Sequence, residues 1–222
     1  MKDKLKETDK SRIKRAHQRA DYDRDAVNAI LDATPMCHVA YLIDGAPHIT
    51  PTFHWREGNH IYWHGSSASR FLKRAANAQV SLCVSCLDGL VLARSAFHHS
   101  VNYRSVILYG EATPVKNVEE KEERLRYFLE GLCPGRWDTL RPITQKELKA
   151  TSVLGMPIDE GAAKVRTGQP VDDEEDYALS IWAGVLPLER VTGEPVSDPR
   201  NLPGVEVPAH VRNYREAVGE ED

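Results

Sequence analysis

The stretch from Ala46 to Arg74 constrains the fold most, because it indicates two strands, a turn and a helix in immediate succession. Pro47 to Trp55 is rich in β-branched and aromatic residues, and His60 to His64 resumes an alternating pattern after a turn that contains Gly58. These segments predict an antiparallel hairpin. The small, mostly hydroxyl-bearing residues that follow lead into a predicted helix with one apolar and one basic face.

The start of that helix is a candidate phosphate site. Free backbone N–H groups and the positive end of the helix dipole favour an anion, and Ser69, Arg70 and Lys73 lie beside them. The alternative is that these are an ordinary serine cap and solvated surface cations. A Walker or dinucleotide motif needs a parallel strand and several glycines, whereas this loop follows a hairpin and contains only Gly65. Nucleotide binding of the usual α/β type is therefore disfavoured.

The other elements are predicted from the same kinds of pattern. Helices are expected from Asp23 to Ala33, from Asn117, and after the capping-box pair that begins at Thr144. Strands joined by short turns, with no strict alternation of strand and helix, predict a mainly β fold: an antiparallel barrel of about six strands with peripheral helices. Besides the two strands of the central hairpin, the expected strands are residues 37–43, 80–86, 90–94, 102–115, 153–158 and 179–188, with a hairpin turn at Asp44-Gly45 and a bulge at Gly110.

The 222 residues, 41% hydrophobic and 28% charged, are typical of an ordinary globular protein. No internal repeat or low-complexity linker divides the chain. We therefore predict one domain over residues 1–192, with an N-terminal helical arm, and an extended C-terminal arm over residues 193–222, which are rich in Pro and Gly.

Charge and hydropathy exclude several classes. A net charge of −4 argues against a nucleic-acid binder. No apolar run approaches the roughly 18 residues of a membrane span, and the charged N-terminus lacks a signal-peptide core, so a cytoplasmic location is expected. Cys83 and Cys86 spell C-x-x-C, but residues three apart on a strand point to opposite faces, so no metal site is expected.

Three segments together resemble a known family: a strand that begins Thr-Pro-Met, the block ITPTFHWREGNHIYWHGSSASRFLKRAANAQVSLCV, and the later strand HSVNYRSVILYGEA. They are similar to the pyridoxamine 5′-phosphate oxidase-like FMN-binding split barrels, closest to the flavin-nucleotide-binding and nitroimidazole-resistance branch. The similarity runs from Arg19 to Leu188 and is most specific from His48 to Val84.

The resemblance implies a Greek-key split barrel and a homodimer with FMN at the subunit interface. The chain differs from a true oxidase in two ways. His48 and Phe53 stand where that pattern has an Arg and a Lys, and its C-terminal Trp and Arg motif is not recognisable. These differences disfavour vitamin B6 oxidation. Carried over by position, the cofactor contacts are the flavin-edge strand His48, Ile49, Thr50, Pro51, Thr52 and Phe53, the second-strand residues Trp63 and His64, the phosphate residues Ser69, Arg70 and Lys73, Arg104 and Ser105 on the long strand, and Trp182 from the partner subunit.

Flavin binding implies two-electron chemistry at flavin N5. We expect an FMN-dependent oxidoreductase that acts on a small molecule, such as a nitro compound or free flavin, with NAD(P)H as donor; no catalytic side chain is identified. The alternative is a non-catalytic carrier or sensor of flavin or haem. Thr50, Thr52 and His54 alternate onto one strand face that is either directed at the ring or simply the polar face of an edge strand. A homodimer is also expected because a split barrel leaves open strand edges.

Overall fold

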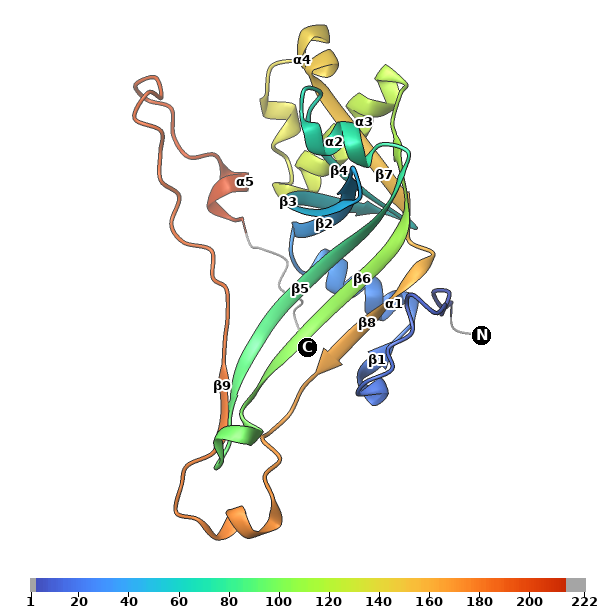
Figure 1. Ribbon diagram of the computed structural model, residues 1–222. Helices are drawn as coiled ribbons and strands as arrows, with labels where there is room; N and C mark the ends of the chain where they lie inside the picture. The colour runs from blue at the N-terminus through green and yellow to red at the C-terminus, as the bar shows by residue number, and fades with distance from the viewer. Residues whose placement is uncertain (1–2, 215–222) are drawn as a thin grey trace.

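The computed structural model describes residues 3–214, and its nine strands form a continuous antiparallel sheet. The order is β1-β8-β6-β7-β4-β3-β2-β5-β9, and an additional β5–β6 pairing closes the six strands β2 to β7 into a barrel (Figure 1). The predicted six-stranded antiparallel barrel is therefore confirmed. The strands are β1 Ala20–Asp21, β2 Met36–Ile43, β3 Ala46–Glu57, β4 His60–Ser66, β5 Ala78–Leu92, β6 Ser100–Pro114, β7 Thr151–Pro157, β8 Glu160–Arg166 and β9 Gly184–Pro187.

Helices lie outside the barrel, and α1 to α4 begin where the sequence places caps. Asp23, Ser69 and Asn117 each accept a hydrogen bond from a backbone N–H in the first turn, and Thr144 forms the expected capping box with Glu147. The helices are α1 Arg24–Asp32, α2 Arg70–Ala75, α3 Val118–Leu132, α4 Gln145–Ala150 and α5 Ala209–Arg212, with 3₁₀ turns at His17–Arg19, Ala96–His98, Trp137–Thr139 and Glu174–Ala178.

The hairpin between β2 and β3 fixes the register of the region that later forms the site. Asp44 and Gly45 both adopt positive φ, 52° and 81°, as a two-residue turn of type I′ requires. The turn pairs Tyr41 with His48 and Met36 with Phe53. Residues on β2 and β3 consequently alternate between the barrel interior and one outward face.

The core fills the barrel and extends under two of the helices. Trp63, Leu82 and Leu108 lie inside the barrel and are fully buried. Helix α1 packs Val27 and Leu31 against the same cluster. A second apolar cluster lies between the β3–β4–β7 part of the barrel and helices α3 and α4, and consists of Trp55, Tyr62, Leu125, Leu148 and Val153.

Several strand predictions were wrong. The two expected strands at 80–86 and 90–94 are one strand, β5, because the chain shifts register between Leu87 and Gly89 without turning. Gly110 forms no bulge: pairing runs straight through it, and an added Cβ there would lie 2.7 Å from Met156 Cγ. Strand β8 was missed, since EGAAKVR contains only one β-branched residue.

The two arms differ from each other. Within residues 3–16 there is no helix; Leu5 is buried and short bridges tie Lys4 to Asp23 and Lys6 to Glu160, so the expected N-terminal helical arm was wrong. The C-terminal arm is extended from 188 to 208, as expected, and leads into α5 (Figure 1). Tyr214, after α5, lines a cavity together with residues of α1, β3 and α3. The part of this prediction that concerns residues 215–222 lies outside the described residues.

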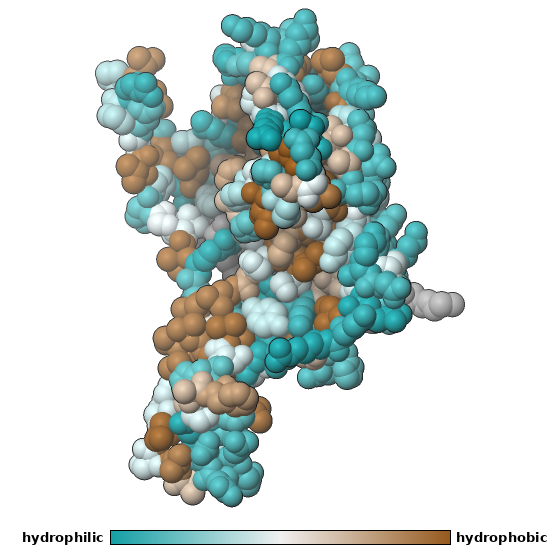
Figure 2. Space-filling view, viewed as in Figure 1, coloured by the Kyte–Doolittle hydropathy of each residue, from teal (hydrophilic) through white to brown (hydrophobic). Residues whose placement is uncertain are grey.

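Strands β5 and β6 continue past the barrel as a long ribbon, with β9 paired to the far end of β5 (Figure 1). The expected strand at 179–188 is reduced to Gly184–Pro187, because a 3₁₀ turn and an irregular loop precede it. Figure 2 shows apolar side chains gathered at this end of the molecule. We call this end, formed by the far ends of β5 and β6, β9 and the loop before it, the distal lobe. Its exposed apolar residues include Leu87, Phe97, Val171, Tyr177, Leu179, Ile181, Trp182 and Leu186.

Candidate functional site

The candidate site is the free edge of β3. Strand β4 pairs with β3 only from His54 to Glu57, so within the described residues 46–53 have a strand neighbour, β2, on one side only. Backbone N–H and C=O groups on an unpaired edge are available to bond a ligand. The strand that the resemblance places against the flavin is therefore an unpaired sheet edge over residues 46–53 of the described structure.

Side chains along this edge alternate in exposure. Ile49 and Phe53 are 68% and 44% exposed, and Pro51 between them is exposed. The other set, His48, Thr50 and Thr52, is half-buried and turned to the barrel side. A flat ligand on the edge therefore meets apolar groups on one side and polar groups on the other.

Tyr41, which was not among the predicted site residues, joins this edge to helix α2. Its hydroxyl lies 3.1 Å from Thr50 Oγ1, and its ring stacks on His48 with the centroids 5.7 Å apart. On its other side the ring contacts Phe71 of α2, at 5.0 Å. The signal was present: a two-residue turn at Asp44-Gly45 places Tyr41 opposite His48.

The cations at α2 are exposed, as a phosphate site requires. Arg70 and Lys73 have no ion-pair partner among residues 3–214, whereas Arg74 lies 3.8 Å from Asp44. Ser69 caps the helix by accepting a hydrogen bond from Leu72 N at 3.5 Å. Because α2 has only six residues, its dipole is small and charge on a bound phosphate would be balanced mainly by the side chains.

The two predicted residues on β4 lie on opposite faces of the strand. Trp63 has no exposed surface and fills the barrel, and its contact with a cofactor stays a prediction. His64 is half-buried between Trp55 and Phe128, with ring centroids 5.8 Å and 4.7 Å away. Burial lowers the pKa of His64, which favours the neutral imidazole at neutral pH.

Arg104 and Ser105 do not join the β3 edge within one subunit. They occupy opposite faces of β6, and β2 and β5 separate that strand from β3. Arg104 forms a bidentate ion pair with Asp88, at 3.0 Å and 2.9 Å, and Ser105 Oγ donates to Lys164 O at 3.2 Å.

Trp182 is 69% exposed in the loop before β9, at the other end of the molecule from α2 (Figure 1). Its ring covers Gly184, where an added Cβ would lie 2.9 Å from it. Within one subunit it is remote from the β3 edge. Its predicted role as a contact from the partner subunit stays a prediction.

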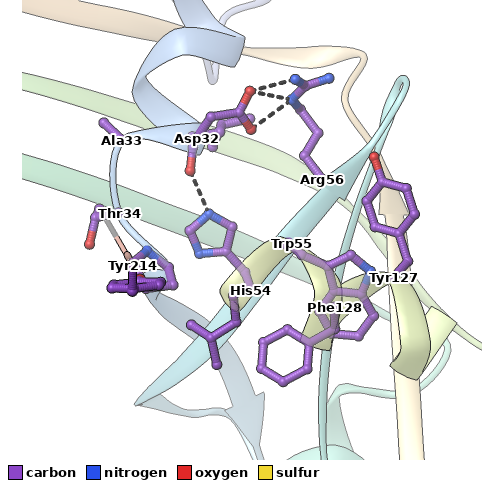
Figure 3. A pocket seen from close by; sticks show the side chains of 13 residues that line it. Asp32, Ala33, Thr34, His54, Trp55, Arg56, Tyr127, Phe128 and Tyr214 are labelled. Carbon is purple, nitrogen blue, oxygen red and sulfur yellow. Dashed lines mark hydrogen bonds and ion pairs between the residues drawn. The ribbon is translucent and has the colours of Figure 1, made fainter. Parts of the chain in front are cut away.

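A cavity of about 330 Å³ lies beside the other end of β3, between the end of α1, helix α3 and Tyr214 (Figure 3). His54 lines it but is only 3% exposed; its Nε2 lies 2.9 Å from Leu31 O. Burial lowers the pKa of His54. Because its ring is buried and bonded to α1, His54 does not share the half-exposed position of Thr50 and Thr52.

The described part of the chain contains neither a metal-binding cluster nor a membrane-spanning helix. No group of three His, Cys, Asp or Glu side chains is arranged to hold a metal ion among residues 3–214. In the same range, no helix is long and apolar enough to cross a membrane.

Comparison with known proteins places this geometry in context. The model of the family described as pyridoxamine 5′-phosphate oxidase matches residues 23–165. No match was found among curated proteins. The solved structures include a flavocytochrome from Azotobacter vinelandii, 50% identical, which covers 94% of this chain and 97% of its own with a TM-score of 0.90.

A second structure, the FAD and haem binding protein from Mycobacterium smegmatis, is 36% identical and covers 87% of this chain and 96% of its own, with a TM-score of 0.84. A third, named for 5-nitroimidazole antibiotic resistance and from Bacteroides thetaiotaomicron, is 19% identical over 66% of this chain and 86% of its own, with a TM-score of 0.55. At that identity the third similarity concerns the fold alone.

Proposed function

Because the chain belongs to the pyridoxamine 5′-phosphate oxidase family, we propose that it binds a flavin along the free edge of β3 and transfers electrons through it. The observation that carries the proposal is that β3 pairs on one side only over residues 46–53, in the stretch that matches the family's flavin-edge strand. Tyr41 and Phe71 connect this edge to the exposed cations of α2. When bound, the flavin would supply two-electron redox chemistry at N5.

Different residues of the chain would contact different parts of the cofactor. Backbone groups of 48–53 would bond the polar edge of the ring system, Ile49 and Phe53 would cover it, and Arg70 and Lys73 would balance phosphate charge. Tyr41 would keep Thr50 in place through the 3.1 Å contact. None of these roles requires a side chain that acts as acid or nucleophile.

The identity of the flavin has two candidates. FMN is favoured because Arg70 and Lys73 form a compact cationic group suited to one terminal phosphate and the chain has no Gly-rich pyrophosphate loop. FAD is favoured by the 36% identical structure, whose name includes FAD. Extraction of the cofactor and chromatography separates them.

We also propose that the protein holds haem. The support is that two structures at 50% and 36% identity, each covering most of this chain, are named a flavocytochrome and an FAD and haem binding protein. With both groups present, the chain would act as an oxidoreductase that passes electrons between flavin and haem or to a small acceptor. A carrier or sensor that holds the same groups without turnover is the alternative.

A homodimer is proposed on the exposed apolar face of the barrel. Met36 and Phe53 are cross-strand partners, both more than 40% exposed, and Leu42, Ile49 and Ile107 extend the face across β2, β3 and β6. The distal lobe is a second exposed apolar surface. Such areas on a soluble chain are typical of protein interfaces. A twofold partner would also give Trp182 a route to the other subunit's flavin edge.

The test is the purified protein itself. Its visible spectrum, extracted cofactors and oxidation of NADH or NADPH with a nitroaromatic or quinone acceptor would be measured together. Flavin with steady-state turnover supports the oxidoreductase; flavin without turnover supports the carrier. A protein that neither retains flavin nor binds added FMN or FAD would contradict the proposal.

A further inference from the structure

His64 differs from the other histidines in how its ring is held. Neither of its nitrogens has a hydrogen-bond partner among residues 3–214; Nδ1 is buried, and Nε2 is not. The ring is positioned instead by Trp55 and Phe128, through contacts at 5.8 Å and 4.7 Å. An imidazole fixed by packing, with one accessible and uncommitted nitrogen, is able to bind a metal centre.

The other histidines are less suited to that role. His54 and His99 each use a ring nitrogen on a backbone carbonyl, at 2.9 Å and 2.8 Å, and His98 lies 3.4 Å from Asp173. His210 has its Nε2 buried. His48 is stacked on Tyr41, and the remaining three, His17, His38 and His60, are exposed to solvent.

The position of His64 in the sheet is equally specific. Pairing between β3 and β4 ends at His54 and Trp63, so His64 is the first residue of β4 beyond it. There the two strands diverge, and the free edge of β3 begins. Phe53, 44% exposed, contacts Phe128 with the ring centroids 6.4 Å apart, so exposed apolar surface continues from the ring that contacts His64.

We propose that His64 binds the iron of a haem through Nε2, rather than serving as the flavin contact that the family resemblance implies. The inference rests on the haem-binding part of the proposed function. A neutral imidazole is the form that binds iron, and the apolar surroundings that lower the pKa of His64 keep it neutral. Exposed Phe53 and half-buried Phe128 offer the apolar contacts that a porphyrin needs.

The arrangement would also place the two cofactors next to each other. His64 adjoins the end of the β3 edge on which the flavin ring is proposed to lie. A haem bound at His64 would therefore sit beside the flavin site of the same chain, and electrons would pass between them without a large movement of the protein.

The test compares His64→Phe and His64→Gly with His60→Ala, a matched variant four residues earlier on the same strand whose side chain is exposed. Full-length protein would be loaded with haemin, and its haem content, Soret spectrum and ferric EPR spectrum measured beside its flavin content. His64→Phe preserves the packing against Trp55 and Phe128, and removes the nitrogen.

We expect both His64 variants to bind haem at least tenfold more weakly, or to lose the spectral signature of a nitrogen ligand, with flavin content unchanged. Added imidazole should restore that signature in His64→Gly, and His60→Ala should match wild type. Unaltered haem spectra and affinity in both His64 variants would overturn the assignment. If wild type holds flavin but takes up no haem, the haem part of the proposed function fails as well, and the flavin part stands.

Discussion

Replacing Arg70 by Ala tests whether the cations of α2 bind the flavin phosphate. Arg70 is exposed and has no ion pair within residues 3–214, so its replacement in the free protein breaks no ion pair in that range. A charge-assisted hydrogen bond contributes about 1.5–3 kcal/mol when shielded and about 0.2–1 kcal/mol when exposed. For a partly covered phosphate the contribution of Arg70 to binding should lie between these values, near 1–2 kcal/mol. Its loss would raise Kd roughly 5- to 30-fold.

The assay is titration of apoprotein with FMN, FAD and riboflavin, followed by flavin fluorescence. We expect Arg70→Ala to weaken FMN and FAD but to change riboflavin less than twofold. Arg74→Ala is the matched control, because Arg74 lies on the same helix but is paired with Asp44 at 3.8 Å. Equal losses for all three flavins, or equal effects of the two variants, would refute the phosphate assignment.

Three further predictions concern stability and assembly. Burial lowers the pKa of His54, so the unfolded chain binds more protons than the folded chain at acidic pH. The free energy of unfolding should therefore fall as the pH drops below about 6.5, and it should fall less in His54→Gln. Urea titrations at pH 5 to 8 measure both. Gly155→Ala should lower the free energy of unfolding by about 1–3 kcal/mol, because the added Cβ would lie 2.5 Å from Tyr62. In the same assay Gly193→Ala should leave that free energy unchanged, because nothing lies within 4 Å of its added Cβ. Ile49→Asp should shift sedimentation toward monomer while leaving the circular dichroism unchanged, since Ile49 is 68% exposed; a variant as dimeric as wild type would remove this face from the interface.

The elements around the candidate site could be predicted because their signals are local. Each signal depends on a few neighbouring residues: the Asp44-Gly45 turn, the hydroxyl-rich turn before α2, and the alternation on β3. The structure has all three features. The open edge of β3 could not be derived in this way. It depends on where β4 leaves β3, which is set by the long-range pairing of β4 with β7.

The surroundings of the candidate residues could not be predicted for the same reason. Barrel closure buries Trp63, and the ring of His54 is bonded to the end of α1. The ion pair of Arg104 with Asp88 depends on the register of β5 against β6. Alternation indicates that two faces exist; tertiary packing decides which face is covered.

Hydrogen–deuterium exchange of the apoprotein with and without flavin tests the central claim most directly. The amides of residues 46–53, which have a strand neighbour on one side only, should exchange more slowly once flavin is bound, and peptides of α2 should follow. Peptides from the cavity beside His54 should change little. Protection at that cavity, with residues 46–53 unaffected, would place the flavin elsewhere and contradict the account.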